Sequence, residues 1–224
     1  MEQKQSSFAS ALVEWGKHGL NRYAWRRTSD PYRILIAEIL LRKTTREQVE
    51  QVFPDFIRNF PTVEALSTAR TEDIRKTVRS LGLENIRASG LSRLAKAIVK
   101  RHHGKIPADK DQLIELPSVG QYTSNAVLCM AYKQHLPLVD TNVIRIMTRV
   151  FSIKSRKRRP HTDPKLWDLV ASLIPSGKAR SFNIALLDLG RSLCLPQNPK
   201  CSECPLVSVC DYGRGRKLTK RSSS

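Results

Sequence analysis

The sequence predicts an all-α protein, because three features of its 224 residues agree. Apolar residues recur at steps of three and four positions along most of the chain, the period of a helix with one buried face. The alternation of apolar and polar residues that indicates a β-strand is nearly absent, and residues 136–139 come nearest to it. Proline, glycine, serine and threonine separate the helical runs, as expected at helix ends. The clearest runs are 7–17, 32–41, 45–59, 85–101, 121–132, 142–150 and 182–195.

The chain is strongly basic. It has 39 Lys and Arg residues against 20 Asp and Glu, a formal net charge of +19. Such an excess on a folded chain predicts a polyanionic partner, because basic side chains that neutralise phosphates release condensed counterions. Two clusters stand out, at residues 154–159 and 214–221. A nucleic-acid binder with no chemistry of its own fits this composition as well as a DNA-acting enzyme does.

The sequence shows no sign of a membrane or export segment. No stretch approaches the roughly 18 uninterrupted apolar residues of a membrane-spanning helix, and the first residues lack the apolar core of a signal peptide. We therefore expect no membrane partner. We expect a monomer that stays in the cytoplasm, associated with the nucleoid.

Four of the five cysteines lie close together, at Cys194, Cys201, Cys204 and Cys210. Thiolates this close would repel one another unless a metal centre neutralised them. Zinc sites usually have two short cysteine pairs, whereas only one short pair occurs here. The spacing therefore favours a [4Fe–4S] cluster over zinc. The remaining Cys129 lies in an apolar helical run and is expected to be buried as a small hydrophobic residue.

Residues 116–123, with the sequence LPSVGQYT, lie between two helical stretches and predict a tight hairpin. Backbone N–H groups at the start of the second helix can bind a phosphate without reading sequence. Val119, Gly120 and Gln121 are the expected DNA contacts. An ordinary turn between two packed helices would show the same residues.

Two carboxylates are candidates for catalysis. Asp140 precedes a predicted helix, where aspartate is a common N-cap, and it could also stabilise positive charge that develops on a sugar. Glu38 interrupts the apolar run 34–41. Burial would favour its neutral form, which suits a proton donor or a group that hydrogen-bonds a base. A plain polar stripe that pairs Glu38 with Arg42 is the alternative.

These motifs together resemble the endonuclease III/MutY family of DNA glycosylases, from about residue 23 to residue 210. The cysteine spacing is similar to the family's iron–sulfur loop, and residues 116–123 to its helix-hairpin-helix, with Ser118 where the family usually has glycine. Residues 139–146, VDTNVIRI, resemble the element whose aspartate is catalytic. The resemblance implies that Asp140 is the catalytic carboxylate and that Lys200, inside the cysteine loop, contacts phosphate.

The same resemblance implies a fold and a partner. It implies two helical lobes with the DNA cleft between them: residues 29–135, with the helix-hairpin-helix at about 110–132, and residues 1–28 with 136–224, which carry the iron–sulfur loop. The implied partner is double-stranded DNA that contains a mismatch. The implied chemistry is hydrolysis of an N-glycosidic bond after the target nucleotide has been extruded.

Tyr122 distinguishes branches of the family. Family members with lyase activity carry lysine at this position and form an imine with the sugar, which a phenol cannot do. Tyr122 therefore implies a glycosylase without strong lyase activity, although a buried structural tyrosine would look the same. Glu38 is similar to the glutamate that protonates the departing adenine in MutY. Archaeal mismatch-specific thymine glycosylases also have glutamate at this position.

Three features favour thymine or uracil opposite guanine over adenine as the target. The residues after the Glu38 helix read RKTT instead of the QQT of MutY, so Arg42 and Lys43 are expected to enter the base stack. Leu83 stands where MutY has an aromatic wedge. The chain also stops soon after Cys210, without a domain for 8-oxoguanine. A MutY-like adenine glycosylase acting on A·G or A·8-oxoG is the alternative, and an iron–sulfur DNA-binding protein without activity is a more distant one.

Overall fold

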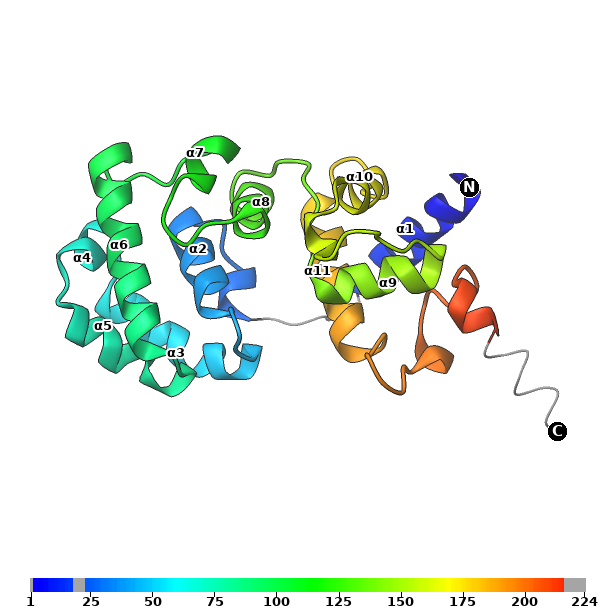
Figure 1. Cartoon of the computed structure of the whole chain (residues 1–224), viewed down its shortest axis with the longest axis horizontal. Coiled ribbons are helices and arrows are strands. Elements are labelled where there is room, and N and C mark those ends of the chain that lie inside the picture. The colour runs from blue at the N-terminus through cyan, green and yellow to red at the C-terminus, as the bar shows by residue number, and fades with distance from the viewer. Residues whose placement is uncertain (1, 18–22, 216–224) are drawn as a thin grey trace. The chain divides into compact units, whose positions relative to one another are not determined.

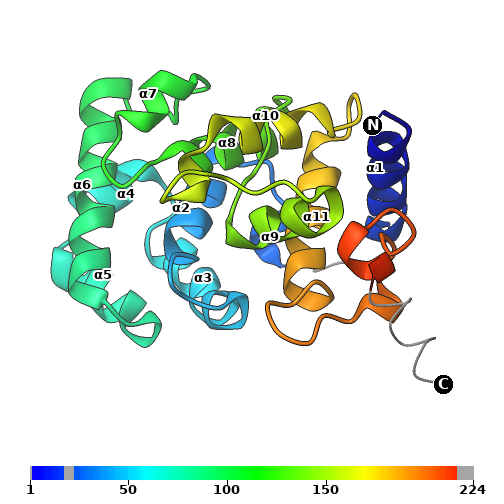
Figure 2. The same cartoon turned by 45° about the vertical axis from the view of Figure 1, so that its right-hand side comes forward.

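The computed structural model describes residues 2–17 and 23–215. Within them the chain is helical and contains no strand, which confirms the all-α prediction (Figures 1 and 2). The α-helices of the described residues are α1 (Glu2–Gly16), α2 (Pro31–Leu40), α3 (Arg46–Asn59), α4 (Val63–Thr68), α5 (Thr71–Val78), α6 (Glu84–His102), α7 (Lys110–Ile114), α8 (Gln121–Met130), α9 (Thr141–Phe151), α10 (Pro164–Ser172) and α11 (Ala179–Ser192). Short 3-10 turns are η1 (Ala24–Arg26), η2 (Arg79–Leu81), η3 (Pro160–Thr162) and η4 (Cys201–Glu203).

The helices α4, α5 and α10 lie outside the clearest runs of the sequence. Each has fewer than ten residues, so few apolar positions repeat within them. α4 and α10 begin at side-chain caps, from Thr62 and Asp163. No helix in the described part of the chain is long and apolar enough to cross a membrane.

The chain divides into two compact units. The central unit comprises residues 22–134, and the terminal unit comprises residues 1–21 together with 135–224. The two chain ends therefore meet in one unit, where α1 packs against α11. Each unit is described separately below.

The central unit is built around α2 and α6. α2 packs against α8, and α6 packs against α4 and α5, as Figures 1 and 2 both show. The side chain of Asp30 caps α2 by accepting hydrogen bonds from the backbone N–H groups of Tyr32 and Arg33. Every residue from 34 to 40 is buried. α2 is thus a core helix, fully enclosed along most of its length.

The terminal unit packs α9 and α11 together, with α1 and α10 around them. Its core includes three phenylalanine rings, and the Phe8 centroid lies 5.3 Å from that of Phe151 and 6.3 Å from that of Phe182. Residues 136–139, the most strand-like stretch of the sequence, pair with no strand. Instead the side chain of Asn183 accepts a 2.9 Å hydrogen bond from the Leu138 N–H and donates one of 2.9 Å to the Leu136 carbonyl. These two hydrogen bonds from Asn183 fix the segment that leads to Asp140.

Candidate functional site

Glu38 lies in the middle of α2 and is only 8% exposed. Its neighbours on both sides along the helix are apolar and buried, so a solvated polar stripe does not describe this helix face. Because α2 packs against α8, the helix that carries Glu38 lies beside the helix that begins with Gln121 and Tyr122. Tyr122 itself is partly buried.

Arg42 follows α2 and turns toward the hairpin. Its guanidinium donates hydrogen bonds to the Ser118 carbonyl and, at 3.2 Å, to the Thr123 hydroxyl. Burial lowers the Arg42 pKa, and the charge of Glu38 opposes that change. The side chain expected to enter a base stack is therefore bonded to the protein's own hairpin. The neighbouring Lys43 is exposed and has a left-handed backbone with φ of 54°.

The hairpin joins α7 to α8. Ser118 has φ of 64°, the left-handed conformation in which glycine is the least strained residue. Val119 is buried, while Gly120 and Gln121 are exposed at the start of α8. α8 has no side-chain hydrogen bond at its N-cap, Gly120. The positive end of its helix dipole is therefore presented without a capping side chain, the arrangement that suits a phosphate.

Leu83 precedes α6 and is 51% exposed. Its backbone is left-handed, with φ of 53°, which costs a non-glycine residue roughly 1 kcal/mol. Because the Leu83 side chain is largely exposed, its burial within the protein does not compensate for the strain of its backbone. Its position is that of a side chain available to a partner.

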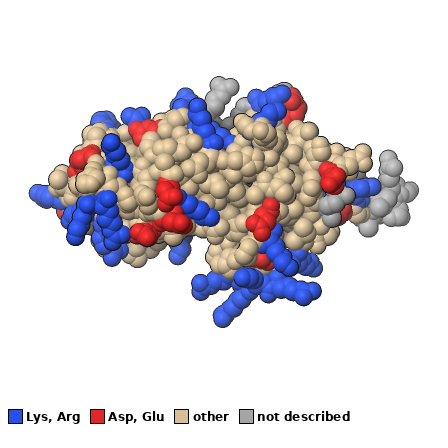
Figure 3. All heavy atoms as spheres, turned by 90° about the horizontal axis from the view of Figure 1, so that it is seen from above, with Lys and Arg blue, Asp and Glu red and all other residues tan. Residues whose placement is uncertain are grey.

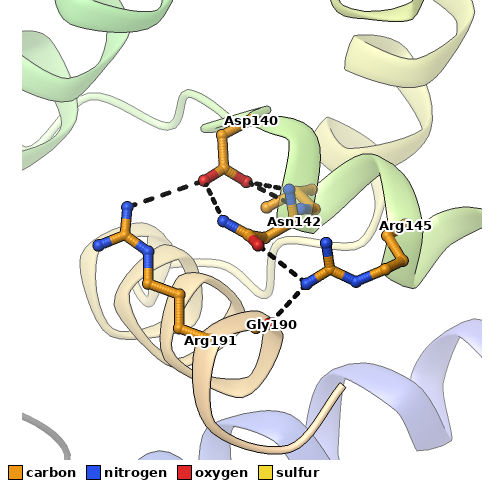
Figure 4. Close-up of polar contacts among 6 residues, drawn as sticks. Asp140, Asn142, Arg145, Gly190 and Arg191 are labelled. Atoms are coloured by element: carbon orange, nitrogen blue, oxygen red, sulfur yellow. Dashed lines mark hydrogen bonds and ion pairs between the residues drawn. The ribbon is translucent and has the colours of Figure 1, made fainter. Parts of the chain in front are cut away.

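Asp140 caps α9. One carboxylate oxygen accepts hydrogen bonds of 2.8 Å from the backbone N–H groups of Asn142 and Val143. The other accepts 2.8 Å from the Asn142 side-chain amide and lies 3.9 Å from the Arg191 guanidinium (Figure 4). These contacts hold the carboxylate in one orientation, and the Asp140 side chain is 21% exposed to solvent. Asp140 is both a helix cap and a fixed, accessible anion.

A second layer of contacts holds Asn142. Arg145 donates 2.8 Å to the Asn142 side-chain oxygen and 2.6 Å to the Gly190 carbonyl (Figure 4). It also donates 2.7 Å to the Cys194 carbonyl. Roles for Asn142, Arg145 and Arg191 were not predicted from the sequence. The first two follow Asp140 at two and five positions, a spacing that places them on the first turns of α9, whereas nothing in the sequence links Arg191 to Asp140.

The four clustered cysteines line one cavity of about 380 Å³, a volume that includes space open to solvent. Burial, with a smaller contribution from the other three thiols, raises the pKa of Cys204 to about 11, although a backbone hydrogen bond from Leu206 opposes the change. Burial also raises the pKa of Cys210. Four thiols that share one cavity need a cationic centre before they can ionise together.

Hydrogen-bond donors lie beside the cysteines that share the cavity. Arg149 supplies cationic character, since its guanidinium lies 3.3 Å from the Cys194 Sγ. The backbone N–H of Gly213 donates to the Cys210 Sγ at 3.3 Å. Four cysteines with donors to their sulfurs fit a thiolate-bound centre such as an iron–sulfur cluster. Cys129 is 1% exposed, as expected of a buried hydrophobic residue.

On the face seen in Figure 3, Lys and Arg are more prominent than Asp and Glu, although most of that face belongs to other residues. The basic residues of the 154–159 cluster are all exposed, as is Lys200 beside the cysteines. Of the second predicted cluster, 214–221, only residues 214 and 215 lie within the described residues.

Comparisons with known proteins identify the family of this chain. Residues 36–172 match the family described as HhH-GPD superfamily base excision DNA repair protein, and residues 194–210 match the iron–sulfur binding domain of endonuclease III. A thymine-DNA glycosylase of Aeropyrum pernix is 45% identical over 90% of this chain and 92% of its own length. A thymine/uracil-DNA glycosylase of Pyrobaculum aerophilum is 41% identical over 95% and 94%.

A solved structure, that of a thermostable thymine-DNA glycosylase, superposes with a TM-score of 0.90 at 33% identity, over 96% of this chain and 98% of the other. The cysteines that line the cavity are the first and last residues of the matched iron–sulfur domain and two between them. The chain therefore belongs to the HhH-GPD superfamily of base excision DNA repair proteins, binds DNA, and is a DNA glycosylase with an iron–sulfur cluster.

Proposed function

We propose that this protein removes thymine or uracil mispaired with guanine and leaves an abasic site. The observation that carries the proposal is Asp140, a partly buried carboxylate whose two oxygens are held by the start of α9 and by Asn142. Cleavage of an N-glycosidic bond develops positive charge on the sugar, and a fixed anion stabilises that charge more than a mobile one does.

Hydrolysis follows from the residues available. As the bond between the base and the sugar breaks, its electron pair leaves with the base, and water adds to the sugar carbon. Asp140 stabilises the cationic sugar and can accept the proton of that water. The buried Glu38 is suited to hydrogen-bond the departing base or to give it a proton. Tyr122 has no amine, so the sugar is not passed to an imine and the strand stays intact.

The choice of pyrimidine is supported by Leu83 and by the relatives. An exposed leucine can fill the gap left by an extruded nucleotide, and a mismatched nucleotide costs less to extrude than a paired one. Both curated relatives named above are thymine or thymine/uracil glycosylases. The hairpin at Gly120 and Gln121 would bind phosphate in the central unit, and Lys200 would contact phosphate from the terminal unit. We also propose that the protein acts as a monomer, which light scattering with and without duplex would measure.

The test is a set of matched duplexes that contain T·G, U·G, A·G or A·8-oxoG. Base release, followed by alkaline cleavage of the abasic strand, should occur for T·G and U·G. Asp140→Asn should lose excision by at least about 10³-fold while it keeps duplex binding, and Asp168→Asn, an exposed carboxylate of α10, is the control. Release of adenine alone would replace the proposal with a MutY-like function, and binding without any release would leave only a DNA-binding protein.

A further inference from the structure

Arg87 is a buried cation whose guanidinium donates hydrogen bonds to four backbone carbonyls. It lies in the first turns of α6 and is 7% exposed. Its guanidinium donates 2.8 Å to the Gly82 carbonyl and 2.6 Å to the Arg42 carbonyl. It donates further bonds of 3.3 Å to Ile39 and 3.2 Å to Leu40.

The position of these carbonyls explains why a buried charge is tolerated. Ile39 and Leu40 end α2, at the negative end of the helix dipole. The Ile39 carbonyl also accepts 3.4 Å from the Arg42 N–H, and the Leu40 carbonyl accepts from the Thr44 hydroxyl, so Arg87 adds to partners already present. Arg87 therefore caps the C-terminal end of α2, although Ile39 and Leu40 lie 48 and 47 positions before it in the sequence. A guanidinium has five donors in a rigid fork, and this fork is shared between two separate loops.

Two of the four carbonyls have a further feature in common. Gly82 precedes Leu83, and Arg42 precedes Lys43. Leu83 and Lys43 are both left-handed, with φ of 53° and 54°, and both are exposed. Arg87 thus holds the peptide in front of each of two strained, exposed side chains.

Arg42 extends the contact to the hairpin. Its guanidinium bonds to the carbonyl of Ser118, the residue of the hairpin with φ of 64°. Three left-handed, non-glycine residues from three loops of the central unit are therefore connected through two arginines. Strained conformations of this kind persist only where the surroundings hold them.

We propose that Arg87 is a positioning residue for base extrusion, which fixes Leu83 and Lys43 at a set spacing so that they enter the duplex as one rigid element. This inference rests on the proposed function, because it assumes that the target nucleotide leaves the stack. Arg42 joins that element to the phosphate-binding hairpin. Rigid placement matters because a wedge that moves freely fills the vacated space only part of the time, which lowers the extruded population.

The decisive experiment is a double-mutant cycle of Arg87→Lys with Leu83→Ala. Lysine keeps the charge but lacks the fork that spans both loops. Extrusion is followed by the fluorescence of 2-aminopurine placed beside the target in a U·G duplex. Single-turnover excision is measured on the same duplex and on single-stranded uracil DNA, which needs no extrusion from a stack.

We expect Arg87→Lys to lower both the fluorescence change and the duplex excision rate by about tenfold, with little change on single strands. Leu83→Ala should then add almost nothing in the Arg87→Lys background, because the wedge is already misplaced. Arg93→Lys, an exposed arginine on the same helix, should behave as the parent in both assays.

Additive losses in the cycle, or equal losses on duplex and single strands, would show a general structural role and overturn the proposal. Should Arg87→Lys fail to fold by thermal melting, the cycle is run with Arg87→Gln, whose amide cannot reach both loops at once, and the same non-additivity is required. Absence of excision by the parent protein would refute the proposed function alone, since the fluorescence change reports extrusion without it.

Discussion

Gly190 of α11 and Asn142 of α9 pack so closely that a Cβ at position 190 would stand 2.7 Å from the Asn142 Cβ. Gly190→Ala should therefore displace Asn142, which orients Asp140, and loosen the Gly190 carbonyl from Arg145. We expect a loss of about 1–3 kcal/mol in the free energy of unfolding and a larger relative loss in excision than in duplex affinity.

Denaturant unfolding and single-turnover excision on a U·G duplex check this prediction. Ser181→Ala, at an exposed position of the same helix, is the control for a change on α11 that touches nothing near Asp140. Parent-like excision by Gly190→Ala would mean that the carboxylate keeps its orientation without Asn142.

Ser118→Gly should stabilise the protein. Ser118 is left-handed, and removing its Cβ relieves a strain of about 1 kcal/mol, less the entropy that glycine adds to the unfolded chain. Ser89→Gly, at an exposed site inside α6, should instead lower the free energy of unfolding by about 0.5 kcal/mol. Chemical denaturation measures both changes. A less stable Ser118→Gly protein would contradict the claim that the Ser118 backbone is strained.

Tyr122→Lys should create strand-nicking activity, because the new amine can attack the sugar carbon and form an imine. Borohydride should then trap a covalent complex between the protein and a U·G duplex. Gln121→Lys adds the same amine one residue earlier, at an exposed site, and should give no trapped complex. Trapping by both variants, or by neither, would contradict the role given to position 122.

Cys201→Ala should abolish the iron–sulfur cluster, because Cys201 is one of the four cysteines that line the cavity. We expect the parent to contain about four iron and four sulfide per chain, and Cys129→Ala, outside the cavity, to contain as much. In Cys201→Ala, hydrogen exchange should rise across residues 194–213 and duplex affinity should fall, while α2 and α8 stay protected. Zinc in the purified parent would contradict the cluster.

Much of the fold could be predicted from short stretches of sequence. The periodicity of 32–41 predicts α2 and that of 142–150 predicts α9, because a helix depends on neighbours three and four residues away. The spacing of the four cysteines likewise predicts that they share one site, since they are joined by short loops. The short helices α4 and α5 could not be read in this way, because too few turns repeat.

The site depends more on the tertiary structure. Residue types alone determined that Asp140 would cap a helix and that Tyr122 would lack an amine. Only the folded chain decided that Arg42 binds the hairpin, that Arg87 bonds to loops more than forty residues away, and that Arg191 lies near Asp140. The physical reason is that an arginine has five donors and a long side chain, so its partners are set by whichever carbonyls the packing brings within reach.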